Sequence, residues 1–169
     1  LSVYTIGSVM AENLAEQFGV SRTKLGRVGV ISPWADTDKI MPISKADNPL
    51  NFSLNQDNKI TILYSGNMGI SHDIDSILGA AMILVNDKDI AFLLIGGGEK
   101  WQDAVDFQKS NNLSNLQVLP FQPENMLRYT MALADIALVA LEDGAEGLML
   151  PSKMFYYMAA GAAIVGICR

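Results

Sequence analysis

Residues 146–161 of this chain read Glu-Gly-Leu-Met-Leu-Pro-Ser-Lys-Met-Phe-Tyr-Tyr-Met-Ala-Ala-Gly. An apolar stretch at 135–141 precedes them and a second one follows at 162–167. This order predicts a buried strand, a loop, a helix and another strand. Pro151 fits the first turn of that helix, where its missing N–H costs no hydrogen bond, and Gly161 fits the helix end.

The start of the expected helix carries a polar pair, Ser152 and Lys153. Both would lie beside backbone N–H groups that have no partner in the first turn of a helix, and such groups bind anions. The motif has two interpretations. It is either a phosphate-binding cradle or an ordinary strand–helix connection that binds nothing.

The same alternation of strands and helices extends through the last two thirds of the chain. The strands are apolar on both faces, which indicates a parallel sheet covered by helices on each side. We therefore predict an α/β fold with a Rossmann-like, doubly wound parallel sheet. Strands are expected at 60–64, 90–95, 116–119, 135–141 and 162–167, and helices at 74–86, 99–112, 124–134 and 151–160.

The first third of the chain is organised differently. Residues 2–6 and 28–31 are strand-like and flank an amphipathic helix that Gly19 is expected to end. A polar segment without a sustained period follows, which is typical of a linker. The chain begins without Met and stops directly after a strand, so we expect a domain that is truncated at both ends. The predicted units are an N-terminal remnant with a hinge at 1–43, a linker at 44–58 and the sheet domain at 59–169.

The composition argues against several classes of protein. The net charge is −6 and the twelve Lys and Arg residues form no cluster, which argues against nucleic-acid binding. The single cysteine, Cys168, indicates a reducing compartment, and one His with one Cys excludes the usual zinc sites. No apolar run is long enough to span a bilayer, and the start has no signal segment. We expect a soluble, cytoplasmic protein.

Three glycine-bearing loops are expected at one edge of the sheet, at 65–69, 96–98 and 144–152. Ligands of doubly wound sheets bind at the carboxyl ends of the strands, where these loops lie. The first two loops, taken alone, are better explained by a tight turn or by close packing of the backbone than by a ligand. Their spacing matches neither the dinucleotide fingerprint nor the P-loop. The candidate ligand-binding residues in the first two loops are Gly66, Asn67, Gly69, Gly97 and Gly98.

His72 is the only histidine and follows the first of these loops. Next to Asp73 it is either a ligand-positioning group or, alternatively, a solvated loop residue or a helix cap. The tyrosines Tyr156 and Tyr157 are expected to be packing residues.

The set of motifs resembles the C-terminal, donor-binding half of GT-B glycosyltransferases of the group-1 (family 4) retaining class. Residues 3–8 and 30–36 resemble the end of the N-terminal domain of that class and its hinge. The order of the motifs agrees over nearly the whole chain. The residues that carry the resemblance in the sheet domain are 64–69, 94–98, 117–121, 134–137, 150–153 and 158–161.

The resemblance implies that the chain binds a nucleotide-diphosphate sugar, with uridine as the expected base. Lys153 would neutralise phosphate charge and Glu146 would lie near the sugar, and the reaction would need neither a metal nor a cofactor. The diphosphate would face Gly66, Asn67, Gly69, Pro151 and Ser152, while Gly97 and Gly98 would border the base and ribose.

Two departures from the family pattern stand out. Members of the class carry a second glutamate that would contact the ribose, and Tyr156 occupies its position. The basic residues that often follow the first glycine loop are replaced by the segment 71–73, in which His72 is a partial substitute.

The function implied by the resemblance is transfer of a sugar to a glycan or lipid-linked acceptor in polysaccharide biosynthesis. The acceptor would bind through a domain outside this chain, so the chain alone is expected to be inactive. Two alternatives stay open, a non-catalytic nucleotide-sugar-binding or scaffold module and a sugar-nucleotide epimerase. Peripheral membrane association of the full-length protein, at the inner face, and dimer formation through an exposed sheet edge are further expectations.

Overall fold

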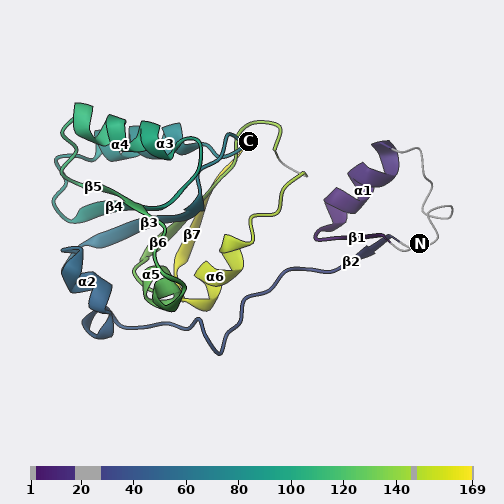
Figure 1. The fold of residues 1–169 in the computed structure, drawn as a ribbon, viewed down its shortest axis with the longest axis horizontal. Helices are drawn as coiled ribbons and strands as arrows, with labels where there is room; N and C mark the ends of the chain where they lie inside the picture. The colour runs from purple at the N-terminus through teal and green to yellow at the C-terminus, as the bar shows by residue number, and fades with distance from the viewer. Residues whose placement is uncertain (1–2, 18–27, 146–147, 169) are drawn as a thin grey trace.

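The computed structural model of the chain describes residues 3–17, 28–145 and 148–168. Its centre is a five-stranded sheet in which every neighbouring pair of strands is parallel (Figure 1). The predicted doubly wound α/β fold is confirmed. The strand order is β5-β4-β3-β6-β7, with bounds β3 Ile60–Asn67, β4 Ile90–Gly97, β5 Leu116–Pro120, β6 Ile136–Ala140 and β7 Ala163–Ile167.

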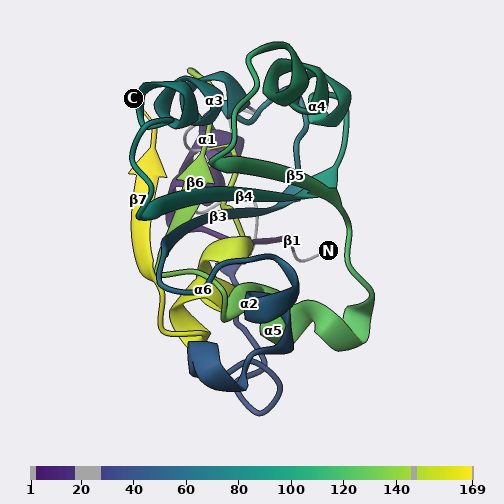
Figure 2. The ribbon, with the colours of Figure 1, turned by 90° about the vertical axis from the view of Figure 1, so that its left-hand side faces the viewer.

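Helices cover both faces of this sheet, as Figure 2 shows from the side. Helices α3 (Ile74–Ile83) and α4 (Trp101–Ser110) pack on one face, where Leu94 of β4 belongs to the buried cluster. Leu93, the neighbouring residue in β4, belongs to the cluster of the other face. Because alternate side chains of a strand point to opposite faces, β4 is apolar in both directions. The helices on the second face are α2 (Pro49–Ser53), α5 (Leu127–Met131) and α6 (Lys153–Ala159).

The strand order reverses at β3. The chain moves outward from β3 through β4 to β5, then returns to the other side of β3 for β6 and β7. Neighbouring connections therefore diverge at the carboxyl ends of β3 and β6. In doubly wound sheets this divergence creates the crevice in which ligands bind.

Strands β3 and β4 are longer than predicted, and glycines expected in loops lie inside them. Gly66 pairs with Gly96 in the parallel ladder. A Cβ atom on Gly96 would lie 1.8 Å from the carbonyl oxygen of Gly66, so a side chain has no room there. The sequence pattern had ended both strands before their glycines, because glycine is a poor strand former. The predicted helix at 124–134 is also divided, into the 3-10 helix η2 (Glu124–Met126) and α5.

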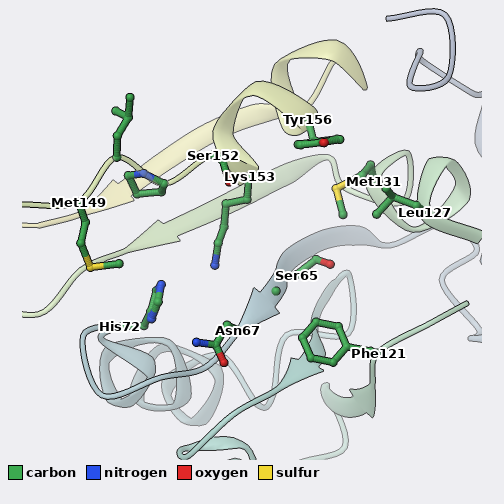
Figure 3. A pocket seen from close by; sticks show the side chains of 13 residues that line it. Ser65, Asn67, His72, Phe121, Leu127, Met131, Met149, Ser152, Lys153 and Tyr156 are labelled. Atoms are coloured by element: carbon green, nitrogen blue, oxygen red, sulfur yellow. The ribbon is translucent and has the colours of Figure 1, made fainter. Parts of the chain in front are cut away.

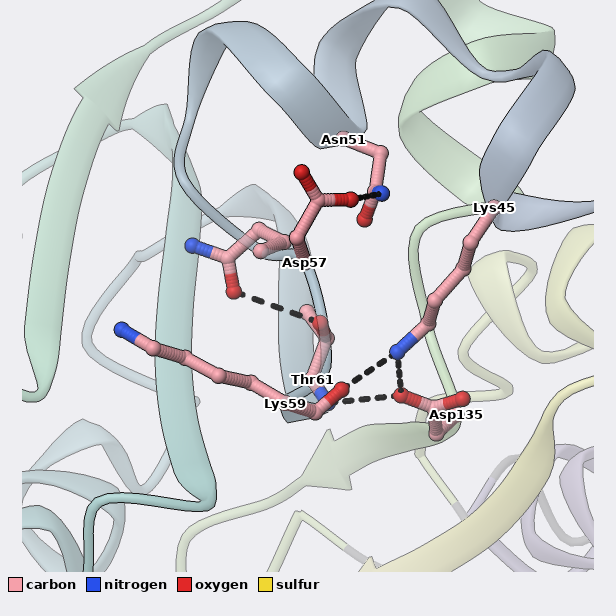
Figure 4. Close-up of polar contacts among 7 residues, drawn as sticks. Lys45, Asn51, Asp57, Lys59, Thr61 and Asp135 are labelled. Carbon is pink, nitrogen blue, oxygen red and sulfur yellow. Dashed lines mark hydrogen bonds and ion pairs between the residues drawn. The ribbon is translucent and has the colours of Figure 1, made fainter.

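The segment 44–58, expected to be a linker, packs against the domain instead. It forms the 3-10 helix η1 (Lys45–Asp47) and α2, and Leu50 and Leu54 pack on the second core cluster. Figure 4 shows how it is attached to the amino end of the sheet. Lys45 Nζ lies 2.5 Å from Asp135 Oδ2, and the same oxygen accepts a 2.7 Å hydrogen bond from the backbone N–H of Thr61. The division of the chain into functional units stays a prediction.

The first part of the chain forms the predicted strand–helix–strand unit. Strands β1 (Val3–Thr5) and β2 (Val28–Val30) are parallel, and α1 (Ser8–Gln17) lies between them in the chain. The unit lies apart from the five-stranded sheet in Figure 1. The predicted helix end at Gly19 lies outside the described residues. Across the described ranges, every helix is too short or too polar to cross a bilayer.

Candidate functional site

A cavity of about 380 Å³ opens where the strand order reverses (Figure 3). Its floor is the end of β3, residues 65–67, and one wall is the segment 149–153 that leads into α6. His72 lies at one side and Phe121 at another. The cavity therefore lies where a doubly wound sheet binds its ligand.

Lys153 is the cation of this cavity. Its Nζ lies 3.7 Å from the centroid of the Tyr64 ring, a cation–π contact. A Cβ atom on Gly66 would lie 3.3 Å from the same nitrogen, so the ammonium lies against bare backbone. Among the described residues, none accepts a hydrogen bond from this buried nitrogen. Burial lowers the pKa of Lys153 to about 7, because the charged form has lost its water.

His72 is buried, with 7% of its surface exposed, so the predicted solvated loop histidine is wrong. The predicted helix cap is also wrong, because the side chain of Asp73 caps α3 by accepting a hydrogen bond from the backbone N–H of Ser76. His72 Nδ1 is shielded from solvent and has no hydrogen-bond partner within the described part of the chain. Burial lowers the pKa of His72, and the charge of Lys153 lowers it further.

A buried tyrosine joins α6 to the floor of the cavity. The hydroxyl of Tyr157 accepts a 2.8 Å hydrogen bond from the backbone N–H of Ser65 and donates to the carbonyl of Ser65 at 3.3 Å. The predicted packing role of Tyr157 is confirmed, since its side chain is fully buried. The hydroxyl of Tyr64 donates to the carbonyl of Asn67 at 2.7 Å and holds the end of β3. These bonds fix the distance between Lys153 and the β3 backbone.

A second lysine at this edge, Lys100, has its partners already. Its Nζ donates to the carbonyl of His72 at 2.9 Å and forms an ion pair with Glu142. The backbone N–H of Glu142 in turn donates to the carbonyl of Ser71 at 3.0 Å. Lys100 therefore links the segment after β3 to the segment after β6.

The structure brings together five of the sequence-predicted site residues. Gly66 and Asn67 line the cavity from β3, and Pro151, Ser152 and Lys153 line it from the opposite wall. Pro151 was predicted inside the first turn of the helix, but α6 begins two residues later, at Lys153. The first hydrogen bond of this turn runs from the backbone N–H of Met154 to the carbonyl of Pro151. Pro151 is therefore the acceptor that precedes the helix and not a residue inside it.

The remaining predicted residues lie elsewhere. Gly98 packs behind the cavity, where a Cβ atom would lie 2.4 Å from Asn67 Oδ1. Gly69 lies against Asn67 Nδ2 in the same way, and Gly97 lies against the ring of Phe121. These three glycines allow close packing around the cavity. Glu146 lies outside the described residues.

Tyr64, Leu127 and Met131 belong to the site but were not assigned to it from the sequence. Tyr64 is the aromatic platform under Lys153. Tyr156, which occupies the position of the family's second glutamate, lines the cavity and is therefore more than a packing residue. Phe121, Leu127 and Met131 form an apolar wall opposite the start of α6. Phe121 is 61% exposed and follows the end of β5 directly. Exposure alone does not identify an aromatic side chain that faces a ligand, so its place in the fold has to be known as well. No cluster of His, Cys, Asp or Glu in the described ranges is suited to holding a metal ion.

Comparison of the sequence with known proteins gives two curated relatives. A protein of Pseudomonas aeruginosa named as a probable glycosyltransferase, WbjE, is 30% identical over 81% of this chain and 34% of its own length. WcaI of Escherichia coli (strain K12), named for glycosyl transfer in colanic acid biosynthesis, is 30% identical over 78% of this chain and 33% of its own length. The resemblance to glycosyltransferases is confirmed. The chain spans about a third of the length of these relatives, and no protein-family model matches it.

Solved structures share the fold. A glycosyltransferase from Rickettsia africae superposes with a TM-score of 0.71 at 13% identity, over 98% of this chain and 44% of that one. Anabaena HepE, solved with UDP and glucose, gives 0.67 at 16% identity, over 97% and 43%. The C-terminal domain of a group-1 glycosyltransferase, LpcC of Francisella tularensis, gives 0.56 at 14% identity, over 78% and 69%. The sheet domain thus has the fold of a GT-B C-terminal domain.

Proposed function

We propose that this chain is the donor-binding part of a glycosyltransferase that takes a sugar from a nucleotide-diphosphate sugar, with UDP as the nucleotide. The observation that carries the proposal is the buried ammonium of Lys153. It lies at the reversal of strand order without a hydrogen-bond acceptor among the described residues. A buried charge without a partner is unfavourable, so the site is suited to a ligand that brings the anionic oxygens.

The shape and polarity of the cavity suit a nucleoside diphosphate. The diphosphate would lie between Lys153 and the bare backbone at Gly66, and backbone N–H groups before α6 would add donors. The nucleoside would extend toward Phe121 and the apolar wall, where an aromatic ring can stack on a base. HepE, which shares the fold, was solved with UDP and glucose, and this supports the choice of nucleotide.

The proposed reaction is transfer of the sugar to a glycan or lipid-linked acceptor in polysaccharide biosynthesis. The name of WcaI, which refers to colanic acid biosynthesis, supports the class of product. Positive charge at Lys153 would stabilise the diphosphate as it leaves the sugar. We propose that this charge serves without a metal ion, which activity of the whole protein in the presence of a chelator would test. The proposed location is the cytoplasmic side of the membrane, where the donor is made available.

The test is calorimetric titration of the chain with UDP, GDP, ADP and CDP, with free phosphate as a control. Replacing Lys153 by Met removes the cation but keeps the apolar stem. We expect UDP affinity to fall by about 10- to 100-fold, the loss of a charge-assisted hydrogen bond. Lys109→Met is the matched control, because Lys109 is exposed on α4 and away from the cavity. Equal affinity in the Lys153→Met variant would refute the proposal.

A non-catalytic binding module is the second candidate, and Tyr156 favours it. This side chain lines the cavity without a carboxylate that could contact a ribose. The two candidates differ in the whole protein. Sugar transfer from a UDP-linked donor to an acceptor supports the enzyme, whereas UDP binding without transfer or donor hydrolysis supports the module.

A further inference from the structure

Lys100 follows the glycine loop after β4 and holds the segment after β3 at two points. Its backbone N–H donates to the carbonyl of Met68 at 2.9 Å, and its Nζ donates to the carbonyl of His72, also at 2.9 Å. Residues 69–71 lie between these two carbonyls, so both ends of this short loop are bonded to one residue. Closing a loop in this way restricts the conformations that the chain between its ends can adopt.

The same ammonium reaches the segment after β6. Lys100 Nζ forms an ion pair with the carboxylate of Glu142, whose backbone N–H donates to the carbonyl of Ser71 at 3.0 Å. Two further backbone bonds of 3.1 Å continue this segment, from the N–H of Ala145 to the carbonyl of Glu142 and from the N–H of Met149 to the carbonyl of Ala145. The Lys100 side chain thus connects the segment after β3 with the cavity wall that begins at Met149.

The ion pair of Lys100 is more enclosed than the pair at the other end of the sheet. The Lys100 side chain is 20% exposed, compared with 32% for Lys45 in its pair with Asp135. Solvent and salt therefore screen the Lys100 pair less. Lys100 also stands at the N-cap of α4, but its side chain makes no capping hydrogen bond there. Its ammonium therefore holds the loops and not the helix that it precedes.

The Lys100–Glu142 pair can act on a ligand only through the segments that it holds. Neither residue is among the described residues that line the cavity, whereas His72 and Met149 both line it. The two held segments thus carry two sides of the cavity. A loop that is free before binding has to be ordered when the ligand arrives, and this ordering lowers the affinity.

We propose that Lys100 is a positioning residue of the donor cavity, which fixes the segment after β3 against the segment after β6 before the nucleotide binds. This inference rests on the proposed function, from which it takes the nucleotide. Because the pair holds both segments in advance, binding does not have to order them. Removing the ammonium frees both segments and lowers the affinity, although no direct contact with the ligand is lost.

The first experiment is calorimetric titration with UDP. Lys100→Met removes the ammonium but keeps the apolar stem, and we expect UDP affinity to fall about three- to tenfold. Lys100→Arg keeps a cation with several N–H donors, and we expect it to restore the affinity to within about twofold of the parent. A lysine that only stabilised the fold would leave the affinity of the folded chain unchanged.

The matched control breaks the ion pair at the amino end of the sheet. Asp135→Asn removes the charge that faces Lys45, away from the cavity. We expect this variant to lose stability, as Lys100→Met does, but to bind UDP with the affinity of the parent. Equal affinity in Lys100→Met and the parent overturns the proposal. An equal fall in Asp135→Asn overturns it too, because affinity would then only follow stability.

The second experiment needs no ligand. His72 is the only histidine in the sequence, so NMR signals of its ring protons report on one side of the cavity. We expect Lys100→Met to shift these signals, because the carbonyl of His72 loses its donor, and Asp135→Asn to leave them in place. Unchanged signals in Lys100→Met overturn the proposal. If that variant does not fold, Glu142→Gln replaces it in both experiments, with an expected fall in affinity of about two- to threefold and the same grounds for rejection.

The outcomes separate this inference from the proposed function. UDP binding that depends on Lys153 but not on Lys100 overturns the inference and leaves the proposed function standing. Failure of every nucleoside diphosphate to bind the parent chain overturns both, because the positioning role takes the nucleotide as its ligand. Lower affinity in Lys100→Met, with rescue by Arg and an unaffected Asp135→Asn, supports both.

Discussion

Two lysines lie at opposite ends of the seam between β3 and β6, and they are treated very differently. Lys45, at the amino end, has a carboxylate from Asp135 and the carbonyl of Lys59, both at 2.5 Å (Figure 4). Lys153, at the carboxyl end, has an aromatic ring but no acceptor among the described residues (Figure 3). One lysine thus stabilises the fold through its ion pair and hydrogen bond, whereas the other keeps an ammonium group that can bind an anion.

The contrast extends to the backbone. At the amino end, a side-chain oxygen of Asp135 satisfies the N–H of Thr61, so the strands are tied by charged groups. At the carboxyl end, glycine carbonyls and glycine Cα atoms pack directly on each other, as at Gly66 and Gly96. One end gains its stability from paired polar side chains. The other gains room for a ligand from the absence of side chains.

The largest effect is expected where the carboxyl end has no room. Gly96→Ala puts a methyl group 1.8 Å from the carbonyl oxygen of Gly66, and neither backbone can move without breaking the ladder. We expect a loss of about 3 kcal/mol or more in the free energy of unfolding, at the upper end of overpacking effects. Chemical denaturation measures it. Gly79→Ala, at an open position in α3, is the control, and an equal response of the two variants would contradict the packing argument.

The second effect concerns the amino end. Asp135→Ala leaves the N–H of Thr61 without its acceptor and Lys45 without its ion pair, and we expect a loss of about 2 kcal/mol. Asp135→Asn keeps an oxygen for Thr61 and should lose only about half as much, because exposed ion pairs contribute little. Denaturation curves of the two variants decide. An equal loss in the two variants would show that the charge, not the acceptor, holds this end.

The third effect is the pH dependence of UDP binding. Of the two lysines, Lys153 is the one that lies in the cavity, so we expect it to determine this dependence. Burial lowers its pKa to about 7, so the unliganded site loses its charge as the pH rises through that value. A bound diphosphate favours the charged form, and binding above pH 7 therefore takes up a proton. We expect the affinity to fall by up to about tenfold per pH unit above 7, because one pKa unit corresponds to about 1.4 kcal/mol.

The measurement is calorimetry with UDP between pH 6.5 and 9. The diphosphate itself adds little slope above pH 7, since its last proton leaves near pH 6 as in other phosphate esters. Lys153→Met should flatten the profile. A parent profile that is already flat would mean that the ammonium keeps its proton in the empty site.

The smallest effect has opposite signs at the two ends. Lys45→Met should lower the free energy of unfolding by about 1 kcal/mol through the lost pair. Lys153→Met should instead raise it near neutral pH, because a buried charge without a partner is removed. Unfolding exposes Lys153 and takes up a proton between its folded pKa of about 7 and its ordinary value of 10.5. The parent therefore gains stability with rising pH across this window, and the advantage of the Met variant disappears toward its upper limit.

The sheet itself was predictable from the sequence because apolar runs and helical periods are local signals. Its five strands and their parallel arrangement follow from strands that are apolar on both faces and alternate with helices. The length of β3 and β4 was not predictable in this way. Whether Gly66 and Gly96 continue a strand depends on their pairing with each other in the ladder. These two residues are 30 positions apart in the sequence, so no local pattern shows the contact.

The site was predictable only in part, for a similar reason. The sequence placed Lys153 beside Gly66, but it could not show that the ammonium lacks an acceptor, since that depends on every neighbour at once. His72 shows the limit most clearly. Its burial results from Lys100 and Glu142, which join the two segments around it and have no sequence signature. The packing of the segment 44–58 on the domain could not be predicted, because its helices are too short to show a period.

The anchoring of Ile40 has a mechanical consequence. Its side chain is 3% exposed within the second core cluster, and Pro42 lies 3.2 Å from where a Cβ atom of Gly161 would be. The connecting chain is thus held against the end of α6 two residues before 44–58 begins. Any swing of the β1–α1–β2 unit relative to the sheet is then taken up by residues 31–39.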